Sequence, residues 1–139
     1  MSIKRSGRQW RLAVVLGTPI AGVIISIPHP VPSGSSIAEF LRPIVVLWLG
    51  VHVALLFLVG FLGLTLWFLT EGVGGRAAAV SHSALVPFLV FYSAYDSIVG
   101  LSTGLLVWRS QGLTGQELVI ADQVVQRFGM LALTLAALC

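Results

Sequence analysis

The sequence has little charge. Only 9% of its 139 residues are Asp, Glu, Lys or Arg, whereas soluble globular domains carry about 25%. With 57% hydrophobic residues and a mean hydropathy of +0.99, the chain has too much apolar surface to hide inside a water-soluble core of this size. The shortage of charge therefore excludes the common soluble classes and predicts an integral membrane protein.

Patterns that carry chemistry are also missing. The single cysteine, Cys139, excludes an internal disulfide, and no Cys/His spacing matches a structural zinc site. There are no paired carboxylates, no HExxH motif and no nucleophile-elbow pattern. The glycine-rich turn 71–76, "EGVGGR", does not have the spacing and lysine of a phosphate loop. We therefore expect no catalytic residue, no metal and no cofactor.

Half of the basic residues lie near the start of the chain: Lys4, Arg5, Arg8 and Arg11. Because they directly precede an apolar run, they indicate a membrane-orienting segment and not a nucleic-acid contact. We predict a cytoplasmic N-terminus, with 28–42 and 109–117 outside and 71–76 inside. Asparagine is absent and arginine far outnumbers lysine, a bias that favours a GC-rich bacterial genome and hence a bacterial plasma (inner) membrane.

Four apolar runs divide the chain: residues 12–27, 43–70, 77–108 and 118–139. The second is the clearest, because only His52 interrupts it. Trp48 and Trp67 stand about 28 Å apart along that helix, as anchors at two membrane interfaces would. The sequence thus predicts a single membrane domain over 1–139, an all-α polytopic transmembrane helical bundle with three to four spans, in contact with the lipid bilayer.

The third and fourth runs depart from a simple span. The third is about 48 Å long if wholly helical, so we expect it to tilt, protrude or kink at Pro87. The fourth begins with mixed polarity and ends at Cys139 without a polar flank. Two explanations stay open for that ending: the span is truncated from a longer protein, or a partner completes the helix.

An aspartate, Asp96, lies inside the third run, about 20 Å along the helix from its polar end. A charged side chain at the bilayer centre costs about 2.5–3.5 kcal/mol on insertion scales, so we expect it to face protein. Tyr92 lies one turn earlier on the same side. Gly100 and Gly104 form a GxxxG pattern, which lets another helix approach closely. This side of the helix is predicted to be a polar packing seam.

Two further polar residues are predicted at a similar depth. His52 and Arg127 each lie about 15 Å inside their own spans, so an intramembrane cluster with Asp96 is geometrically allowed. An Asp–Arg pair would keep the aspartate ionised, whereas an Asp–His pair exchanges a proton near neutral pH. Measured from Trp48, however, His52 is only about 6 Å deep. The alternative, in which Asp96 bonds locally to Tyr, Ser and Thr hydroxyls, therefore stays open.

The other two histidines are interpreted without a ligand role. His29 is read as a solvated histidine in the loop "PHPVPSGSS", and His82 as an interfacial one near the turn 71–76. Because His52 and His82 should differ in height by more than about 10 Å, a haem held between them is not expected.

One histidine in the second span, a Gly/Arg turn after it and the stretch "FYSAYDSIVGLSTG" in the third span stand together in this chain. On these features, residues 48–107 resemble uncharacterised multi-pass membrane proteins of high-GC bacteria. The resemblance implies a multi-pass membrane protein, and it implies no activity and no catalytic residues.

Two functional hypotheses follow. In the first, the chain is a non-enzymatic membrane protein whose polar seam at Asp96 packs helices or binds another membrane subunit or a second copy. In the second, it is a small component of a proton- or ion-linked transporter, with Asp96 as the titrating group and His52 as its relay. A membrane enzyme is the least favoured alternative.

Overall fold

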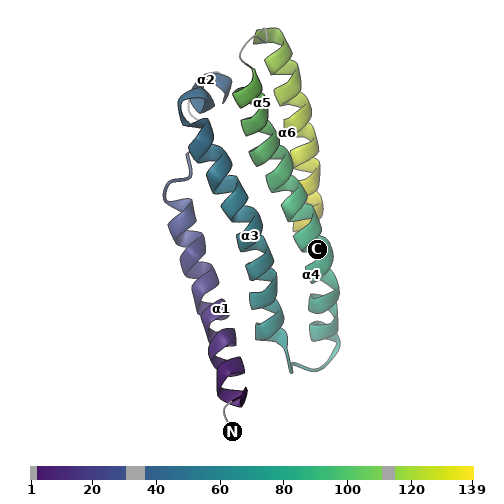
Figure 1. Cartoon of the computed structure of the whole chain (residues 1–139). Helices are drawn as coiled ribbons and strands as arrows, with labels where there is room; N and C mark the ends of the chain where they lie inside the picture. The colour runs from purple at the N-terminus through teal and green to yellow at the C-terminus, as the bar shows by residue number, and fades with distance from the viewer. Residues whose placement is uncertain (1–2, 31–36, 111–114) are drawn as a thin grey trace.

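The computed structural model describes residues 3–30, 37–110 and 115–139. Within these ranges the chain forms helices and no strand. The elements are α1 (Ile3–Ser26), α2 (Ile37–Leu41), the 3₁₀ turn η1 (Arg42–Ile44), α3 (Val45–Thr70), α4 (Arg76–Tyr95), the π-helix η2 (Asp96–Ser102), α5 (Thr103–Arg109) and α6 (Gly115–Ala137). The long helices run side by side (Figure 1).

Four helical segments are long and apolar enough to cross a membrane: Gly7–Ser26, Ile37–Thr70, Arg76–Arg109 and Val119–Ala137. The prediction of an all-α polytopic bundle is therefore confirmed, and the fourth segment meets the same criteria of length and composition as the other three. The chain is built as a multi-pass membrane protein.

The turn between α3 and α4 reverses the chain, so the two helices are antiparallel (Figure 1). Gly72 and Gly75 have φ angles of 82° and 95°, in the left-handed region that glycine adopts without a steric penalty. The chain therefore returns after only a few residues. We call this end of the bundle, where α1 also starts, the N-terminal end. The opposite end, which carries α2, is the α2 end.

The helix after this turn passes through Pro87 without a break, because α4 extends from Arg76 to Tyr95. The irregularity lies further on, at Asp96, where the helix widens into η2 before α5 continues it. The α1 helix likewise continues through Pro19. The distortion of the third span is thus found at its aspartate and not at its proline.

Helix α3 is central to the packing. It contacts α1 on one side and α4, η2 and α5 on the other, while α6 packs against α4 and η2. Helices α1 and α6 consequently occupy opposite sides of the bundle (Figure 1). A buried cluster of Ala38, Leu41, Trp48 and Val107 joins α2, α3 and α5 at the α2 end. The contact between α3 and η2 lies next to this cluster and positions the site.

Candidate functional site: a buried His–Asp pair

A histidine and an aspartate meet between α3 and η2. Nδ1 of His52 lies 2.7 Å from Oδ1 of Asp96, and their side chains are 8% and 5% exposed. A proton must lie between these two atoms: either the imidazole N–H donates to a carboxylate, or a carboxylic acid O–H donates to Nδ1. Asp96 therefore meets a hydrogen-bond partner inside the protein, where it is only 4% exposed.

The approach of the two helices depends on Gly100. A Cβ atom built there would lie 2.1 Å from Nδ1 of His52, well inside any allowed contact. One turn further, a Cβ at Gly104 would lie 2.6 Å from the Leu49 side chain. The two glycines predicted to form a packing seam thus face α3, and the imidazole rests against the backbone of η2 at the first of them.

A tryptophan reinforces this contact. The indole N–H of Trp48 donates to the Gly100 carbonyl oxygen over 2.7 Å, and the Trp48 ring centroid lies 4.4 Å from that of His52. Trp48 is only 4% exposed. The interpretation of Trp48 as an interfacial anchor was therefore wrong, because its N–H is used inside the protein. Trp67 at the other end of α3 is 47% exposed, as an interfacial residue would be.

The π-helical segment begins at the aspartate itself. In a π-helix the backbone bonds span five residues, and such turns are rare and frequently occur at functional sites. The Ser102 hydroxyl donates to the Ser97 carbonyl, also five residues back, over 3.1 Å. This widened turn has no sequence pattern of its own, so sequence reasoning missed it.

A second histidine was also missed. His29, which follows α1, is half-buried, and its ring centroid lies 5.2 Å from that of His52 and 5.5 Å from that of Trp48. The interpretation of His29 as a solvated loop residue was wrong. Its position among prolines hid this contact, because a loop's path across the bundle cannot be read from helical periodicity.

The predicted cluster is only partly assembled. Tyr92 is half-buried and its ring lies near those of Phe88 and Tyr95, and it forms no hydrogen bond with Asp96 among the described residues. Arg127 is exposed on α6, and among the described residues no ion pair joins it to Asp96. The structure therefore brings together His52 and Asp96, and directs Arg127 elsewhere.

Each member of the pair keeps one atom without a hydrogen bond. Nε2 of His52 and Oδ2 of Asp96 are buried and have no partner among the described residues. Thr103 Oγ1 and Asp122 Oδ1 are in the same situation, and both residues line a small cavity of about 20 Å³ between α2, α5 and α6. Buried polar atoms without a hydrogen-bond partner among the described residues thus extend from the pair toward the α2 end.

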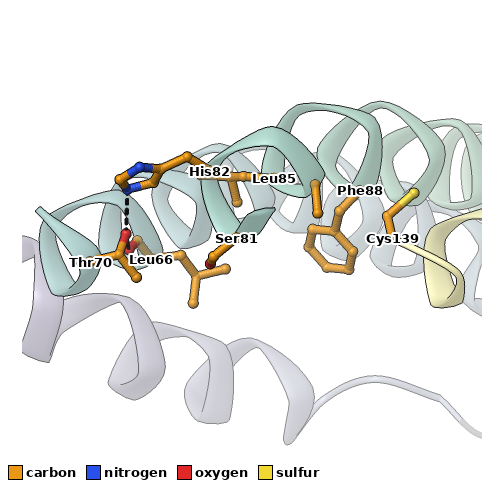
Figure 2. A pocket seen from close by; sticks show the side chains of 8 residues that line it. Leu66, Thr70, Ser81, His82, Leu85, Phe88 and Cys139 are labelled. Carbon is orange, nitrogen blue, oxygen red and sulfur yellow. Dashed lines mark hydrogen bonds between the residues drawn. The ribbon is translucent and has the colours of Figure 1, made fainter. Parts of the chain in front are cut away.

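A larger hollow lies at the N-terminal end. It has a volume of about 210 Å³ and is lined by residues of α3 and α4 together with Cys139. Figure 2 shows the His82 ring next to Thr70, with Nε2 2.6 Å from the Thr70 oxygen. The Thr70 hydroxyl also lies 2.8 Å from the Leu66 carbonyl oxygen, so its single hydrogen can be donated either to that carbonyl or to the histidine.

Among the residues that the structure describes, no three His, Cys, Asp or Glu side chains are grouped so as to hold a metal ion. Comparison of the chain with protein-family models, with curated proteins and with solved structures gave no match. No activity is therefore carried over from a relative, and the pair of His52 and Asp96 is the site with the most distinctive geometry.

Proposed function

We propose that this chain is a non-enzymatic, multi-pass protein of a bacterial inner membrane in which the buried pair of His52 and Asp96 fixes α3 against η2. The observation that supports it is the 2.7 Å contact between two side chains that are 8% and 5% exposed. Inside a membrane, apolar burial does little to hold helices together, so close packing and interhelical hydrogen bonds supply specificity.

The surroundings of the pair support a packing role. The imidazole lies against Gly100, and the Trp48 N–H bonds to the carbonyl of the same glycine. A catalytic or transported group would need room beside the pair, whereas here a backbone segment lies directly against the ring. The polar seam orients α3 relative to the third span, and the remaining helices pack around it.

A double-mutant cycle tests this function. His52→Leu or Asp96→Leu alone leaves one buried polar group unpaired, so each should lower the free energy of unfolding in detergent micelles by about 2 kcal/mol or more. The double variant replaces the pair by two apolar side chains and should cost less than the sum, with a coupling of about 1 kcal/mol or more. Thermal and denaturant unfolding followed by circular dichroism measure these values.

The matched control is His82→Leu, which removes a half-buried histidine that bonds to Thr70 instead. Its effect should add to that of Asp96→Leu within about 0.5 kcal/mol, because the two sites share no partner. If the His52 and Asp96 variants are equally additive, the pair does not hold the helices together and the proposal fails.

A second function, a component of a proton-linked transporter, is favoured by one observation. His52 Nε2 and Asp96 Oδ2 have no partner among the described residues, and the His29 ring lies beside His52. Histidine is the side chain best suited to exchange protons near neutral pH. In this function Asp96 titrates, His52 relays the proton, and His29 connects the pair to the α2 end.

Proton flux distinguishes the two functions. The purified chain is reconstituted into liposomes with an entrapped pH-sensitive dye, and a pH gradient is applied. Transport predicts a flux above that of protein-free liposomes, abolished by the nearly isosteric Asp96→Asn and retained by Asp122→Asn. A wild-type flux equal to that of protein-free liposomes, together with a stability loss in Asp96→Asn, rejects transport and leaves the packing function.

The proposed orientation, with the N-terminus in the cytoplasm, is supported by where the basic residues gather. Arg76 follows the turn at the N-terminal end, the same end at which α1 and its basic residues begin. Arg42 and Arg109 lie at the α2 end. Because the side with more Lys and Arg in short segments stays in the cytoplasm, the α2 end would face outward.

A further inference from the structure

Arg127 lies on the surface of α6, near the middle of its membrane segment. That segment runs from Val119 to Ala137, so Arg127 is about 12 Å along the helix from one end and about 15 Å from the other. Its side chain is exposed, and among the described residues it has no hydrogen bond or ion pair. Facing lipid, an arginine at this depth is among the most costly of side chains.

The depth of Arg127 is fixed by its neighbours on the packed side of α6. A Cβ at Gly129 would lie 2.1 Å from the Val99 side chain, while Asp122 shares a cavity with Thr103. Arg127 lies between these two levels. Since His52 rests against Gly100, the arginine has the same depth as the buried pair but points to the opposite side of the third span.

The exposed face around Arg127 suits a helix. Its members recur at spacings of three and four residues, so they form one stripe along α6. They are Ile120, Gln123, Val124, Arg127, Phe128 and Leu131. Apolar side chains therefore surround one cation, with an amide one turn away, which is the composition of an interhelical contact that uses a polar group for specificity.

Among the residues that the structure describes, no carboxylate of this chain forms an ion pair with Arg127. Asp96 is 4% exposed and paired with His52, and Glu71 is paired with Arg11 at the N-terminal end. A second copy related by a twofold axis along the membrane normal would bring Arg127 against its own counterpart at equal depth, where the like charges repel. A carboxylate that neutralises the Arg127 guanidinium would therefore come from a different protein.

We propose that this face of α6 binds a transmembrane helix of another membrane protein that carries Asp or Glu at the depth of Arg127. The inference rests on the multi-pass membrane role and names the kind of partner. A carboxylate there neutralises the arginine by a charge-assisted, bidentate hydrogen bond, while Gln123 and Phe128 contact the flanking turns of the partner helix.

Synthetic helices provide the test. The probe is a Leu/Ala transmembrane peptide with lysines at both ends and one central Asp, compared with the same peptide carrying Leu. Energy transfer in liposomes is measured between the labelled peptide and the full chain labelled at Cys139, its single, exposed cysteine. The Asp peptide should bind about tenfold more tightly than the Leu peptide. Arg127→Leu should erase this difference, and Gln123→Leu should reduce it.

The control is Arg109→Leu, which removes an exposed arginine at the end of α5 and should leave the preference unchanged. Equal binding of the Asp and Leu peptides to the wild type overturns the proposal. Self-association of the wild type that is lost in Arg127→Leu overturns it too, in favour of a second copy. Neither result bears on the coupling between His52 and Asp96, so the two proposals fail separately.

Discussion

The two sides of α3 are held in different ways. Toward η2 and α5, the contact contains the buried pair of His52 and Asp96 and the bond from Trp48 to Gly100. Toward α1, the buried polar contact joins two threonine hydroxyls, Thr65 and Thr18, over 3.1 Å. Each hydroxyl has one hydrogen, which it can instead donate to the carbonyl one turn back, Phe61 for Thr65 and Val14 for Thr18.

The threonines can therefore satisfy their hydrogen bonds within or near their own helices, whereas the His–Asp contact exists only across the interface. Packing shows the same contrast. Two grooves of about 270 and 400 Å³ open between α1 and α3, while glycines let α3 touch the backbone of η2. The difference indicates that α3 and the third span form a fixed unit, to which α1 is attached more weakly.

The largest effect is expected from a variant that disrupts the contact between α3 and η2. Gly100→Ala places a methyl group where His52 Nδ1 now lies, 2.1 Å from the ideal Cβ position. Overpacking and loss of the pair should together lower the free energy of unfolding in detergent by about 3 kcal/mol or more. Gly60→Ala in α3 is the control, because its Cβ meets nothing within 4 Å. It should be neutral or slightly stabilising. Equal effects would mean that α3 does not approach η2 closely.

A smaller effect is expected from Trp48→Phe. The variant keeps an aromatic ring but removes the N–H that donates to Gly100. The carbonyl still accepts the Thr103 backbone N–H, so the loss should be about 1 kcal/mol. Trp67→Phe, at an exposed position of the same helix, should change the stability by less than about 0.5 kcal/mol. If the two variants unfold alike, the hydrogen bond from Trp48 to Gly100 does not stabilise the contact between α3 and η2.

The smallest loss of stability is expected from a variant at the contact between α3 and α1. Thr65→Val is close in shape and removes the hydroxyl that bonds to Thr18. Because interhelical hydrogen bonds in membranes average about 0.6 kcal/mol, the loss should stay near or below that value. Thr134→Val, which removes a hydroxyl that bonds to the Met130 carbonyl of its own helix, is the matched control. If Thr65→Val lowers the free energy of unfolding as much as Trp48→Phe does, the contacts of α3 with α1 and with η2 do not differ in strength.

The sequence was sufficient for the helices, but it predicted two depths for His52, about 15 Å inside its span and about 6 Å from Trp48. Apolar runs and the rise per residue placed His52, Asp96 and Arg127 at similar heights, and the structure keeps all three near one level. The cost of a charge in lipid also indicated that Asp96 faces protein, and it is 4% exposed. Depth follows from counting residues, which tolerates an error of one or two positions.

The direction in which a side chain points was harder to predict, since each residue turns a helix by about 100° and a small error reverses the face. Arg127 was therefore placed in the cluster although it points away. A row of small residues, Gly129, Ala132 and Ala136, is buried in α6, and this pattern of small residues could have identified the packed face. The contact of His29 depends on the path of a loop, and loops have no repeating residue pattern from which that path could be predicted.

The π-helical turn at Asp96 has a consequence for everything that follows it. Accommodating one surplus residue in a turn rotates the rest of the helix by about 100° relative to an unbroken α-helix. Gly104, which now lies against Leu49 and Trp48, would otherwise point away from α3. Deleting a single amino acid between Asp96 and Ser102 would thus leave the helices before and after the deletion intact. It would rotate α5 relative to α4, so that the side chains of α5 no longer contact the same neighbours.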